Sequence, residues 1–270
     1  MNSYLIDTAQ WEPVSESLLA TVYLRSLETQ KNKGIIQDCK SIEIVNSINY
    51  DFSQYSCPLN QALIAIRTEI IDQFVSNYIA QYPLATIVNL GTGLCTRFFR
   101  LDNGTVQWYG VDLPNIKPIW HRLLGETERH RYLAYSVLDL DWIKKIKQNS
   151  TNKTLFIAEG LLMFLSEIEV RYLLQNIRDK FANSEIIFDS IGTMLANRNR
   201  RSIKVRGTSK KLYRWGIKDL SEIESWGNKI KLVNQWHCLD YHKNRLGWLG
   251  LLSYLPLLRR QVKIGHLKFA

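Results

Sequence analysis

The sequence lacks the marks of a secreted or metal-bound protein. Its four cysteines are widely spaced: Cys39, Cys57, Cys95 and Cys238. Because no two of them form a C-x-x-C pair, we expect neither a zinc site nor a disulfide framework. The first eight residues have no basic start and no apolar stretch of the length that a signal peptide needs. These absences favour reduced thiols and a cytoplasmic location.

Long apolar runs are also missing. The longest mostly apolar stretch, residues 246–258, has only thirteen residues and contains two glycines and a proline. It is too short to span a bilayer, for which about 20 apolar residues are needed. Arg259, Arg260 and Lys263 follow it, so contact with a membrane surface is an alternative. We favour a buried or site-lining segment, and we expect no transmembrane segment.

No internal repeat or low-complexity linker divides the 270 residues, of which 46% are hydrophobic, so we expect one domain. The net charge of +10 is unevenly distributed, because residues 198–231 contain eleven lysines or arginines against three acids. No nucleic-acid-binding motif accompanies this basic stretch, and a solvated face is the favoured interpretation. A nucleic-acid partner, whose binding would weaken steeply with salt, is the alternative. The oligomeric state is left open.

The periodicity of apolar residues predicts helices first and then strands that alternate with helices. Helices are expected over residues 14–31, 41–47, 59–81 and 166–181, and strands over residues 86–90, 106–112, 132–137, 154–158, 185–189, 229–235 and 261–269. Alternating strands and helices form parallel sheets that are covered on both faces. The sequence therefore predicts an α/β fold with seven strands, preceded by a helical extension of 85 residues.

The most specific feature is a glycine turn after the first strand of this sheet. The apolar run of residues 86–90 leads directly into Gly91 and Gly93. Glycine lets the chain turn sharply and lets a ligand approach the backbone where a Cβ would intrude. Asp112 ends the next strand, twenty-one residues after Gly91, where an acid can accept the hydroxyl hydrogens of a ribose. Together these residues predict a nucleotide-like cofactor.

Ligands of open parallel sheets lie outside the carboxyl ends of the strands. This rule also selects the residues Ser136, Val137, Glu159, Gly160, Asp189 and Ser190. Acids at successive strand ends repel phosphates but suit a ligand with hydroxyls and a positive charge. Thr96 stands where a dinucleotide fingerprint has its third glycine, so a nicotinamide dehydrogenase is the weakest alternative. S-adenosylmethionine fits better, and Arg67 on the preceding helix can bind its carboxylate.

A series of short motifs runs through residues 27–165. They are Leu-Glu-Thr at 27–29, Ile-Asn-Tyr-Asp-Phe at 48–52, Arg-Thr at 67–68, Asn-Leu-Gly-Thr-Gly-Leu-Cys-Thr-Arg at 89–97, Trp-Tyr-Gly-Val-Asp-Leu-Pro at 108–114, Ser-Val-Leu-Asp at 136–139 and Ala-Glu-Gly-Leu-Leu-Met-Phe-Leu at 158–165. Taken together, these motifs resemble the leucine carboxyl methyltransferase family. Within it, the chain is most similar to the bacterial branch typified by the tetracenomycin polyketide O-methyltransferases.

The resemblance implies a Rossmann-like class I methyltransferase that depends on S-adenosylmethionine. Its fold would be a seven-stranded, mostly parallel sheet with helices on both faces, an antiparallel last strand and an amino-terminal helical extension. Within one domain we then expect a helical cap at 1–85, a cofactor-binding core at 86–190, and an acceptor-side insertion with the final strands at 191–270.

The resemblance also implies a set of cofactor-binding residues. They are Arg25, Arg67, Gly91, Gly93, Asp112, Leu113, Ser136, Val137 and Glu159. Among them, Arg67 would hold the methionine carboxylate and Asp112 the ribose. Ser136 and Val137 would border the adenine, and Glu159 would approach the amino-acid end. The two glycines would let the cofactor pass over the backbone, and the arginine of the first helix would lie near the cofactor.

Two positions depart from the pattern of the family. Cys95 stands where the family usually has aspartate, and Phe164 where it usually has tyrosine. The missing acid can remove a hydrogen bond that orients the cofactor, so a non-catalytic cofactor-binding or regulatory protein is an alternative. Cys95 as a nucleophile is a further alternative, against which we favour a small buried or half-buried thiol.

The methyl acceptor is the least determined part of the prediction. A carboxylate acceptor needs no base, whereas a phenol with a pKa of ~10 gains from one. Candidate bases are Asp189, His237, Tyr241 and His242. Trp215, Trp226, Trp236 and Trp248 favour a small aromatic or polyketide-like acceptor, with core packing as their other explanation. Transfer to a protein or peptide terminus remains an alternative.

Overall fold

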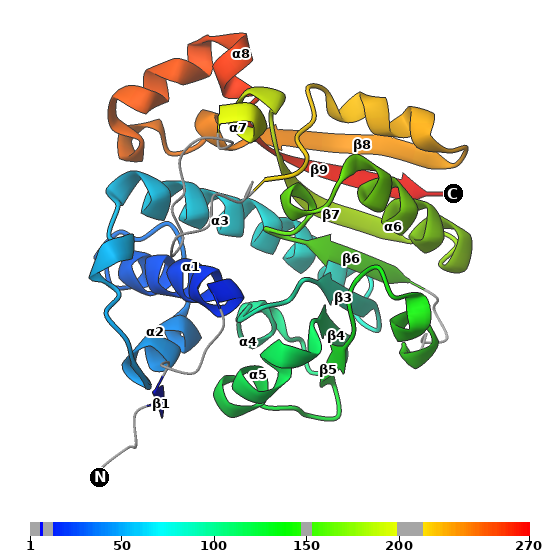
Figure 1. Cartoon of the computed structure of the whole chain (residues 1–270), viewed down its shortest axis with the longest axis horizontal. Coiled ribbons are helices and arrows are strands. Elements are labelled where there is room, and N and C mark those ends of the chain that lie inside the picture. Colours follow the sequence, from blue (N-terminus) through cyan, green and yellow to red (C-terminus); the bar gives the residue numbers. More distant parts are fainter. Residues whose placement is uncertain (1–5, 8–12, 147–152, 199–212) are drawn as a thin grey trace.

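The computed structural model describes residues 6–7, 13–146, 153–198 and 213–270. Its centre is a sheet in the strand order β5-β4-β3-β6-β7-β9-β8 (Figure 1). The seven strands are β3 (Thr86–Leu90), β4 (Gln107–Asp112), β5 (His130–Ala134), β6 (Thr154–Ala158), β7 (Glu185–Ile191), β8 (Ile230–His237) and β9 (Val262–Phe269). β9 runs antiparallel to β7 and β8, and the other neighbouring pairs are parallel. The predicted mostly parallel, seven-stranded sheet is confirmed.

Six of the seven strands lie within two residues of their predicted bounds, and β5 is the exception. It spans His130–Ala134, whereas residues 132–137 were expected. The strand ends early because the chain then turns, with the Asp139 amide donating to the Ser136 carbonyl at 2.9 Å. Ser136 and Val137 therefore follow the strand and lie beyond its carboxyl end.

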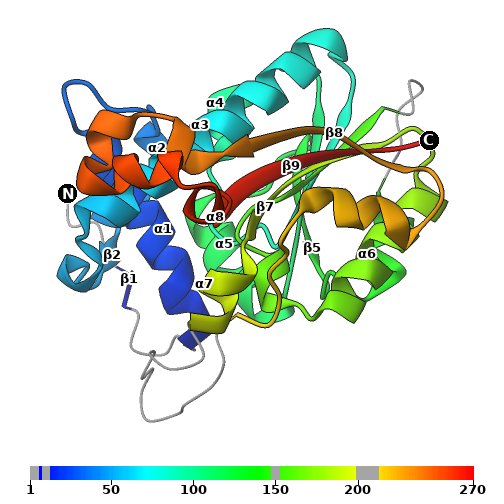
Figure 2. The same ribbon diagram turned by 90° about the horizontal axis from the view of Figure 1, so that it is seen from above.

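Helices cover both faces of the sheet. They include α3 (Pro58–Gln81), α6 (Glu167–Lys180) and the 3-10 helix η6 (Leu220–Trp226). Ile87 and Ile157 pack with α3 on one face, while Val88 and Phe156 pack with α6 and η6 on the other. Figure 2 shows α3 and α6 on opposite sides of the strands. Because both faces are buried, the strands read as nearly continuous apolar runs.

The amino-terminal segment lies beyond the carboxyl ends of the parallel strands (Figure 1). Its elements are β1 (Ile6–Asp7), α1 (Pro13–Thr29), α2 (Cys39–Asn46), β2 (Ile48–Asn49) and the 3-10 helix η1 (Ser53–Tyr55). Asp38 caps α2 by accepting a hydrogen bond from the Ser41 amide. The helices agree with the prediction, but the small parallel pair of β1 and β2 was missed, because two residues carry no readable periodicity.

The remaining elements are short and connect the strands. They are α4 (Arg97–Leu101), η2 (Pro114–Ile116), α5 (Lys117–Leu123), η3 (Leu140–Lys145), η4 (Leu162–Phe164), α7 (Thr193–Arg198), η7 (Cys238–Asp240), η8 (Lys243–Arg245), η9 (Gly247–Tyr254) and α8 (Pro256–Arg259). Of the basic stretch 198–231 that the sequence singled out, residues 199–212, with six of its eleven lysines and arginines, lie outside the described residues.

Core packing, the other explanation that the sequence left open, accounts for most of the tryptophans that were expected around an acceptor. Trp215 and Trp226 are buried in the core, and their rings lie 6.0 Å apart. Trp236 packs edge-on against Phe74 at 5.9 Å. The Trp248 side chain lies outside the described part of the structure. Core packing therefore accounts for Trp215 and Trp226.

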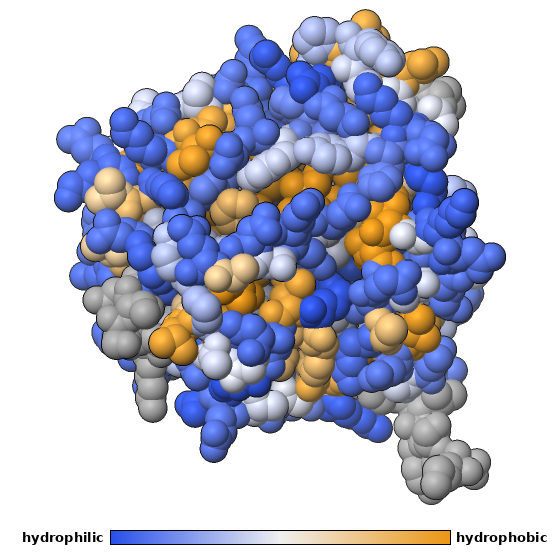
Figure 3. All heavy atoms as spheres, turned by 180° about the vertical axis from the view of Figure 1, so that it is seen from behind, coloured by the Kyte–Doolittle hydropathy of each residue, from blue (hydrophilic) through white to orange (hydrophobic). Residues whose placement is uncertain are grey.

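The apolar stretch 246–258 forms η9 and α8 at an outer corner of the fold, and the expectation that it is buried is only partly right. Leu246 and Ser253 are buried, but several large side chains face outward: Leu251, Tyr254, Leu255 and Leu257. Among the described residues, no helix is long and apolar enough to cross a membrane. The back of the molecule is mostly hydrophilic, with its apolar side chains in small groups between polar ones (Figure 3).

Candidate active site

The glycine turn after β3 is held tightly between two other elements. Gly91 and Gly93 have φ angles of +62° and +46°, which disfavour residues with a side chain. A Cβ on Gly91 would lie 2.8 Å from Leu161, and one on Gly93 would lie 2.6 Å from Leu18 of α1. Both the backbone conformation and the packing therefore require glycine. The role of this turn as a cradle for the cofactor stays a prediction.

Asp112 is fixed at the end of β4 by two backbone amides. Its Oδ2 accepts a hydrogen bond from the Gly93 amide at 2.7 Å, and its Oδ1 accepts one from Leu113 at 2.8 Å. Burial raises the pKa of the carboxyl group, against the effect of these two hydrogen bonds. Each carboxylate oxygen keeps a lone pair for a further donor. The side chain is thus positioned to accept hydrogen bonds from a pair of hydroxyls.

A buried ion-pair network lies beside this turn, at the ends of β6 and β7. Arg67 of α3 donates from Nε to Glu159 and from Nη1 to Asp189, both at 2.9 Å. The other oxygen of Glu159 accepts a hydrogen bond from Arg97 Nη2 at 2.6 Å. Although burial opposes ionisation, Arg97 and Arg67 hold the pKa of Glu159 well below its usual range. Burial raises the pKa of Asp189, an effect that Arg67 only partly offsets.

The network continues from Arg97 toward the amino-terminal helices. Arg97 also pairs with Asp72, which binds Arg100 through Nε at 2.7 Å. Arg100 and Arg25 both contact Asp38 Oδ2 at 2.9 Å. Four arginines and four acids thus alternate in one chain of contacts from Arg25 to Asp189. Such a network fixes the relative positions of α1, α3, α4 and the strand ends.

Arg25 lies between the cap of α2 and the loop after β3. It is buried, pairs with Asp38 and donates from Nη2 to the Leu94 carbonyl at 3.2 Å. It therefore supports the backbone of the loop, and its charge also helps to lower the pKa of Glu159. Its expected place near the cofactor stays a prediction.

The residues expected near the adenine lie next to the turn after β5. Leu138 donates its amide to Ser136 Oγ at 3.3 Å, and the Trp142 indole donates to the Val137 carbonyl at 3.1 Å. The Leu113 side chain is exposed, and the Leu113 carbonyl accepts a hydrogen bond from the Tyr132 hydroxyl at 2.8 Å. The loops after β4 and β5 therefore meet at the edge of the sheet that carries Asp112.

Of the candidate bases, only Asp189 belongs to this group of residues. Its Oδ1 accepts the Gly160 amide at 2.7 Å, and its Oδ2 binds Arg67. His237 lies at the end of β8 in a separate basic hollow. Tyr241 packs with the apolar residues of α3, and His242 pairs with Glu69 of that helix at 2.7 Å. Among the described residues, no group of three or more His, Cys, Asp or Glu could hold a metal ion.

Sequence reasoning missed several members of the site. Asp72, Arg97 and Arg100 complete the network, and Tyr213 lies close enough to Arg67 and Asp189 for both to affect its pKa, which burial raises. Phe164 packs against Tyr213 with ring centres 5.6 Å apart. A signal was available for Arg97, because it belongs to the glycine motif quoted above.

Cys95 stands at the position where the resemblance led us to expect an acid. Its Sγ lies 3.5 Å from Arg97 Nη1, and the thiol is half-buried. Arg97 nevertheless keeps both acidic partners, Asp72 and Glu159. The lost carboxylate therefore does not leave the arginine unpaired.

This sheet order, with a glycine turn and an acid at the ends of adjacent strands, defines a class I methyltransferase fold. The magnesium protoporphyrin IX methyltransferase of Synechocystis PCC 6803, solved with bound SAH, shares it with a TM-score of 0.50 and 10% identity over 95% of this chain and 98% of that one. The chain belongs to the leucine carboxyl methyltransferase family, whose model matches residues 12–178. It is a methyltransferase that depends on S-adenosylmethionine, as the sequence predicted.

Two curated relatives cover most of the chain. The tetracenomycin polyketide synthesis O-methyltransferase TcmP of Streptomyces glaucescens is 28% identical over 236 residues, which are 87% of this chain and 86% of that protein. The S-adenosyl-L-methionine-dependent methyltransferase dpfgK of Gibberella zeae is 26% identical over 265 residues, which again cover 87% of this chain and 86% of that protein.

Proposed function

We propose that this protein is an O-methyltransferase that acts on a hydroxyl or carboxylate of a small aromatic or polyketide-like metabolite. The observation that carries the proposal is the meeting of the glycine turn, Asp112 and the Arg67–Glu159 pair at one edge of the sheet. The resemblance to the polyketide O-methyltransferase TcmP supports the choice of acceptor.

The residues present fit S-adenosylmethionine. A Cβ at Gly91 or Gly93 would clash with Leu161 or Leu18 and so displace the turn, whereas a Cβ at Gly160 would lie 3.7 Å from its nearest neighbour, Arg67 Nη1. Asp112 would accept the ribose hydroxyls with its remaining lone pairs. Arg67 would hold the carboxylate of the cofactor, since Nη2 makes no hydrogen bond within the described part of the chain. Leu113, Ser136 and Val137 would border the base.

When bound, the cofactor supplies a methyl group that its sulfonium has already activated. The protein then has to align the acceptor oxygen with that methyl group and exclude water. The ion-pair network contributes by holding the loops of the site in one arrangement. Asp189 would take the proton from a phenol, and its raised pKa would favour it as a base over an ordinary aspartate. A carboxylate acceptor would need no such step.

The test is calorimetric titration of the purified protein with S-adenosylmethionine, with NAD as the control ligand. We expect S-adenosylmethionine to bind with micromolar affinity and NAD not to bind. Asp112→Asn and Arg67→Ala should each weaken binding at least ~10-fold, because each removes a charged hydrogen-bond partner worth about 1.5 to 3 kcal/mol. Asp141→Asn, which changes an exposed acid paired with Lys144, should bind like wild type.

A folded wild-type protein that does not bind the cofactor would contradict the proposal. If binding is confirmed, a panel of phenols and aromatic carboxylates assayed with labelled cofactor decides the acceptor class. A protein that binds the cofactor but methylates nothing in either class, nor a peptide carboxyl terminus, would support the non-catalytic alternative.

A further inference from the structure

A second polar hollow lies at the same edge of the sheet, beyond β7. It has a volume of about 130 Å³ and is lined by Lys218, Asp219, Gln235, His237, Arg259, Arg260 and Lys263. Because β8 runs in the same direction as β7 and β9 runs opposite to both, the end of β8 and the start of β9 meet there. His237 pairs with Lys263 in the sheet register. Since a water molecule needs about 10–15 Å³, the hollow has room for a polar group of several atoms.

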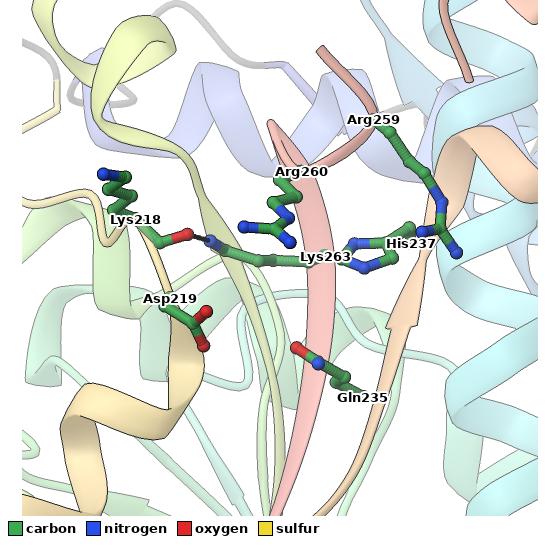
Figure 4. A pocket seen from close by; sticks show the side chains of 7 residues that line it. All are labelled: Lys218, Asp219, Gln235, His237, Arg259, Arg260 and Lys263. Carbon is green, nitrogen blue, oxygen red and sulfur yellow. Dashed lines mark hydrogen bonds between the residues drawn. The ribbon is translucent and has the colours of Figure 1, made fainter. Parts of the chain in front are cut away.

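Lys263 crosses the hollow from β9 toward the backbone of Lys218, with Arg260 next to it (Figure 4). Its ammonium group donates to the carbonyls of Ile217 and Lys218 at 2.6 and 2.8 Å. An ammonium group has three N–H donors, so one remains for another acceptor. The side chain is almost completely buried, with a residue exposure of 1%. A buried cation with a spare donor favours an anionic partner.

The other cations of the hollow differ in how far they are neutralised. Arg259 forms a two-pronged ion pair with Asp240, with contacts of 2.6 to 3.0 Å. Arg260 and Lys218, in contrast, make no ion pair with any described residue. The free guanidinium of Arg260 is the group best shaped to bind a carboxylate or phosphate through two parallel hydrogen bonds.

His237 supplies an independent sign that a ligand belongs here. Its residue is 9% exposed, and its buried Nδ1 has no hydrogen-bond partner among the described residues. Burial lowers the pKa of the imidazole, and Arg259 lowers it further. Buried polar atoms are rarely left without a partner in native proteins. An anion in the hollow would give this ring a partner and would oppose the effect of the arginine.

The acids near the hollow do not neutralise it. Asp219 caps η6 by accepting hydrogen bonds from the amide and hydroxyl of Ser221, and Glu222 closes the same cap. Asp240 is committed to Arg259. Of the acids, only Asp219 itself lines the hollow, where it faces four cationic side chains. The local field therefore favours an anion.

An adjoining hollow extends the site on the side of α8. It has a volume of about 220 Å³ and is lined by Gly192, Thr193, Lys218, Pro256, Leu257, Arg260 and Gln261. The two hollows share Lys218 and Arg260. Pro256 and Leu257 offer apolar surface next to the cations. A ligand with an acidic group and an apolar body can therefore occupy both.

We propose that the hollow at His237, Arg260 and Lys263 is an oxyanion-binding site, which takes a carboxylate or phosphate group. Arg260 and the spare donor of Lys263 hold the oxygens, and His237 donates from its ring. Two sources share this chemistry, namely an organic acid whose apolar body lies along Pro256 and Leu257, and a free inorganic phosphate. The proposal does not depend on the methyl acceptor.

The experiment follows the histidines by NMR in the full-length protein without cofactor, carrying ¹³C at histidine Cε1. The chain has five histidines, and His237→Asn assigns the resonance of interest. Inorganic phosphate is titrated at constant ionic strength and pH 6.5. We expect a saturable shift of the His237 resonance alone, while His242, which pairs with Glu69 elsewhere, stays in place.

Arg260→Gln should weaken this binding at least ~10-fold, because it removes a charge-assisted contact. Arg171→Gln is the matched control, since Arg171 lies over the Trp226 ring and pairs with Glu167. It should leave the affinity unchanged. A shift that is linear and equal for all histidines, or Arg260→Gln binding as tightly as wild type, would overturn the proposal.

A second titration with 2-naphthoate distinguishes the two sources. If naphthoate binds more tightly than phosphate and loses affinity in Leu257→Ser, the site accepts an apolar organic acid. If phosphate binds more tightly and Leu257→Ser has no effect, the site serves a free phosphate. Because the measurement uses no cofactor and no methyl transfer, its result is separate from that of the cofactor titration.

Discussion

Glu159 connects two arginines from different elements, accepting Arg67 Nε at 2.9 Å with one oxygen and Arg97 Nη2 at 2.6 Å with the other. One carboxylate thereby links α3, α4 and the end of β6. Its exposure is low, with only 10% of the side chain accessible. The site depends on this residue for its arrangement as well as for its charge.

Glu159→Gln should destabilise the protein strongly. The substitution leaves Arg67 and Arg97 buried with one fewer negative partner each, and breaking a buried pair of this kind costs about 3–5 kcal/mol. Urea unfolding at neutral pH measures the change in the free energy of unfolding. Glu167→Gln, in an exposed pair with Arg171, should change it by less than about 0.5 kcal/mol. Equal effects of the two variants would contradict the prediction.

The same residue predicts a pH dependence of stability. The folded pKa of Glu159 lies well below the value of 4.5 expected without neighbours. Its contribution is therefore fully present above pH 4.5 and is lost as the pH falls toward the folded value. The free energies of unfolding of wild type and Glu159→Gln should differ most near pH 7, and the difference should shrink toward pH 3. A gap that stays constant over this range would show that the charge of Glu159 is not responsible.

Gly93→Ala should destabilise the protein more than Gly125→Ala, although both glycines have positive φ. Their angles are +46° and +74°, and this conformation costs a residue with a side chain about 1 to 2 kcal/mol. A Cβ at Gly125 meets nothing within 4 Å, whereas one at Gly93 would clash with Leu18 at 2.6 Å. We expect about 1–3 kcal/mol more destabilisation at Gly93, measured by urea unfolding. The alanine at Gly93 should also weaken cofactor binding, and the one at Gly125 should not.

Cys95→Ala should leave the site functional. The thiol is half-buried and lies 3.5 Å from Arg97, which keeps both of its acidic partners. We expect a loss of stability of no more than about 1 kcal/mol and an unchanged cofactor affinity by calorimetry. Abolished methyl transfer with intact cofactor binding would instead identify Cys95 as a catalytic group.

Oxyanion binding at the hollow of His237 should weaken in alkaline solution. Burial lowers the pKa of Lys263 to about 8, so its ammonium group loses its charge as the pH rises through that value. Losing one charged donor should reduce the affinity ~10-fold between pH 7 and pH 9. Phosphate titrations at these two pH values, followed at the His237 resonance, give the measurement. The Lys263→Met variant should bind phosphate weakly at both pH values, and its affinity should change little between them.

The sequence predicted those parts of the site whose signal is local. Gly91, Gly93 and Asp112 stand at the ends of two short apolar runs, and the parallel-sheet rule brings those ends together. Glu159 and Asp189 followed from the same rule. All five lie at one edge of the sheet in the structure.

Contacts between distant elements could not be predicted in this way. The Asp72–Arg97 pair joins two helices whose relative rotation no periodicity reveals. The contacts of Arg25 with Asp38 and with the Leu94 carbonyl were likewise not readable from the sequence. His237 was weighed as a base or as a structural or exposed residue but not as part of an anion site, because its cationic neighbours come from α8 and β9.

The antiparallel strand β9 has a consequence for synthesis on the ribosome. It lies between β7 and β8, and β8 pairs with no other strand of the sheet. While residues 262–269 are still inside the exit tunnel, β7 has an open edge and β8 has no partner. The cofactor half can begin to fold during translation, but the half with the basic hollow must wait for this last strand. A shortened chain that ends before Val262 would therefore expose the edge of β7 and tend to aggregate.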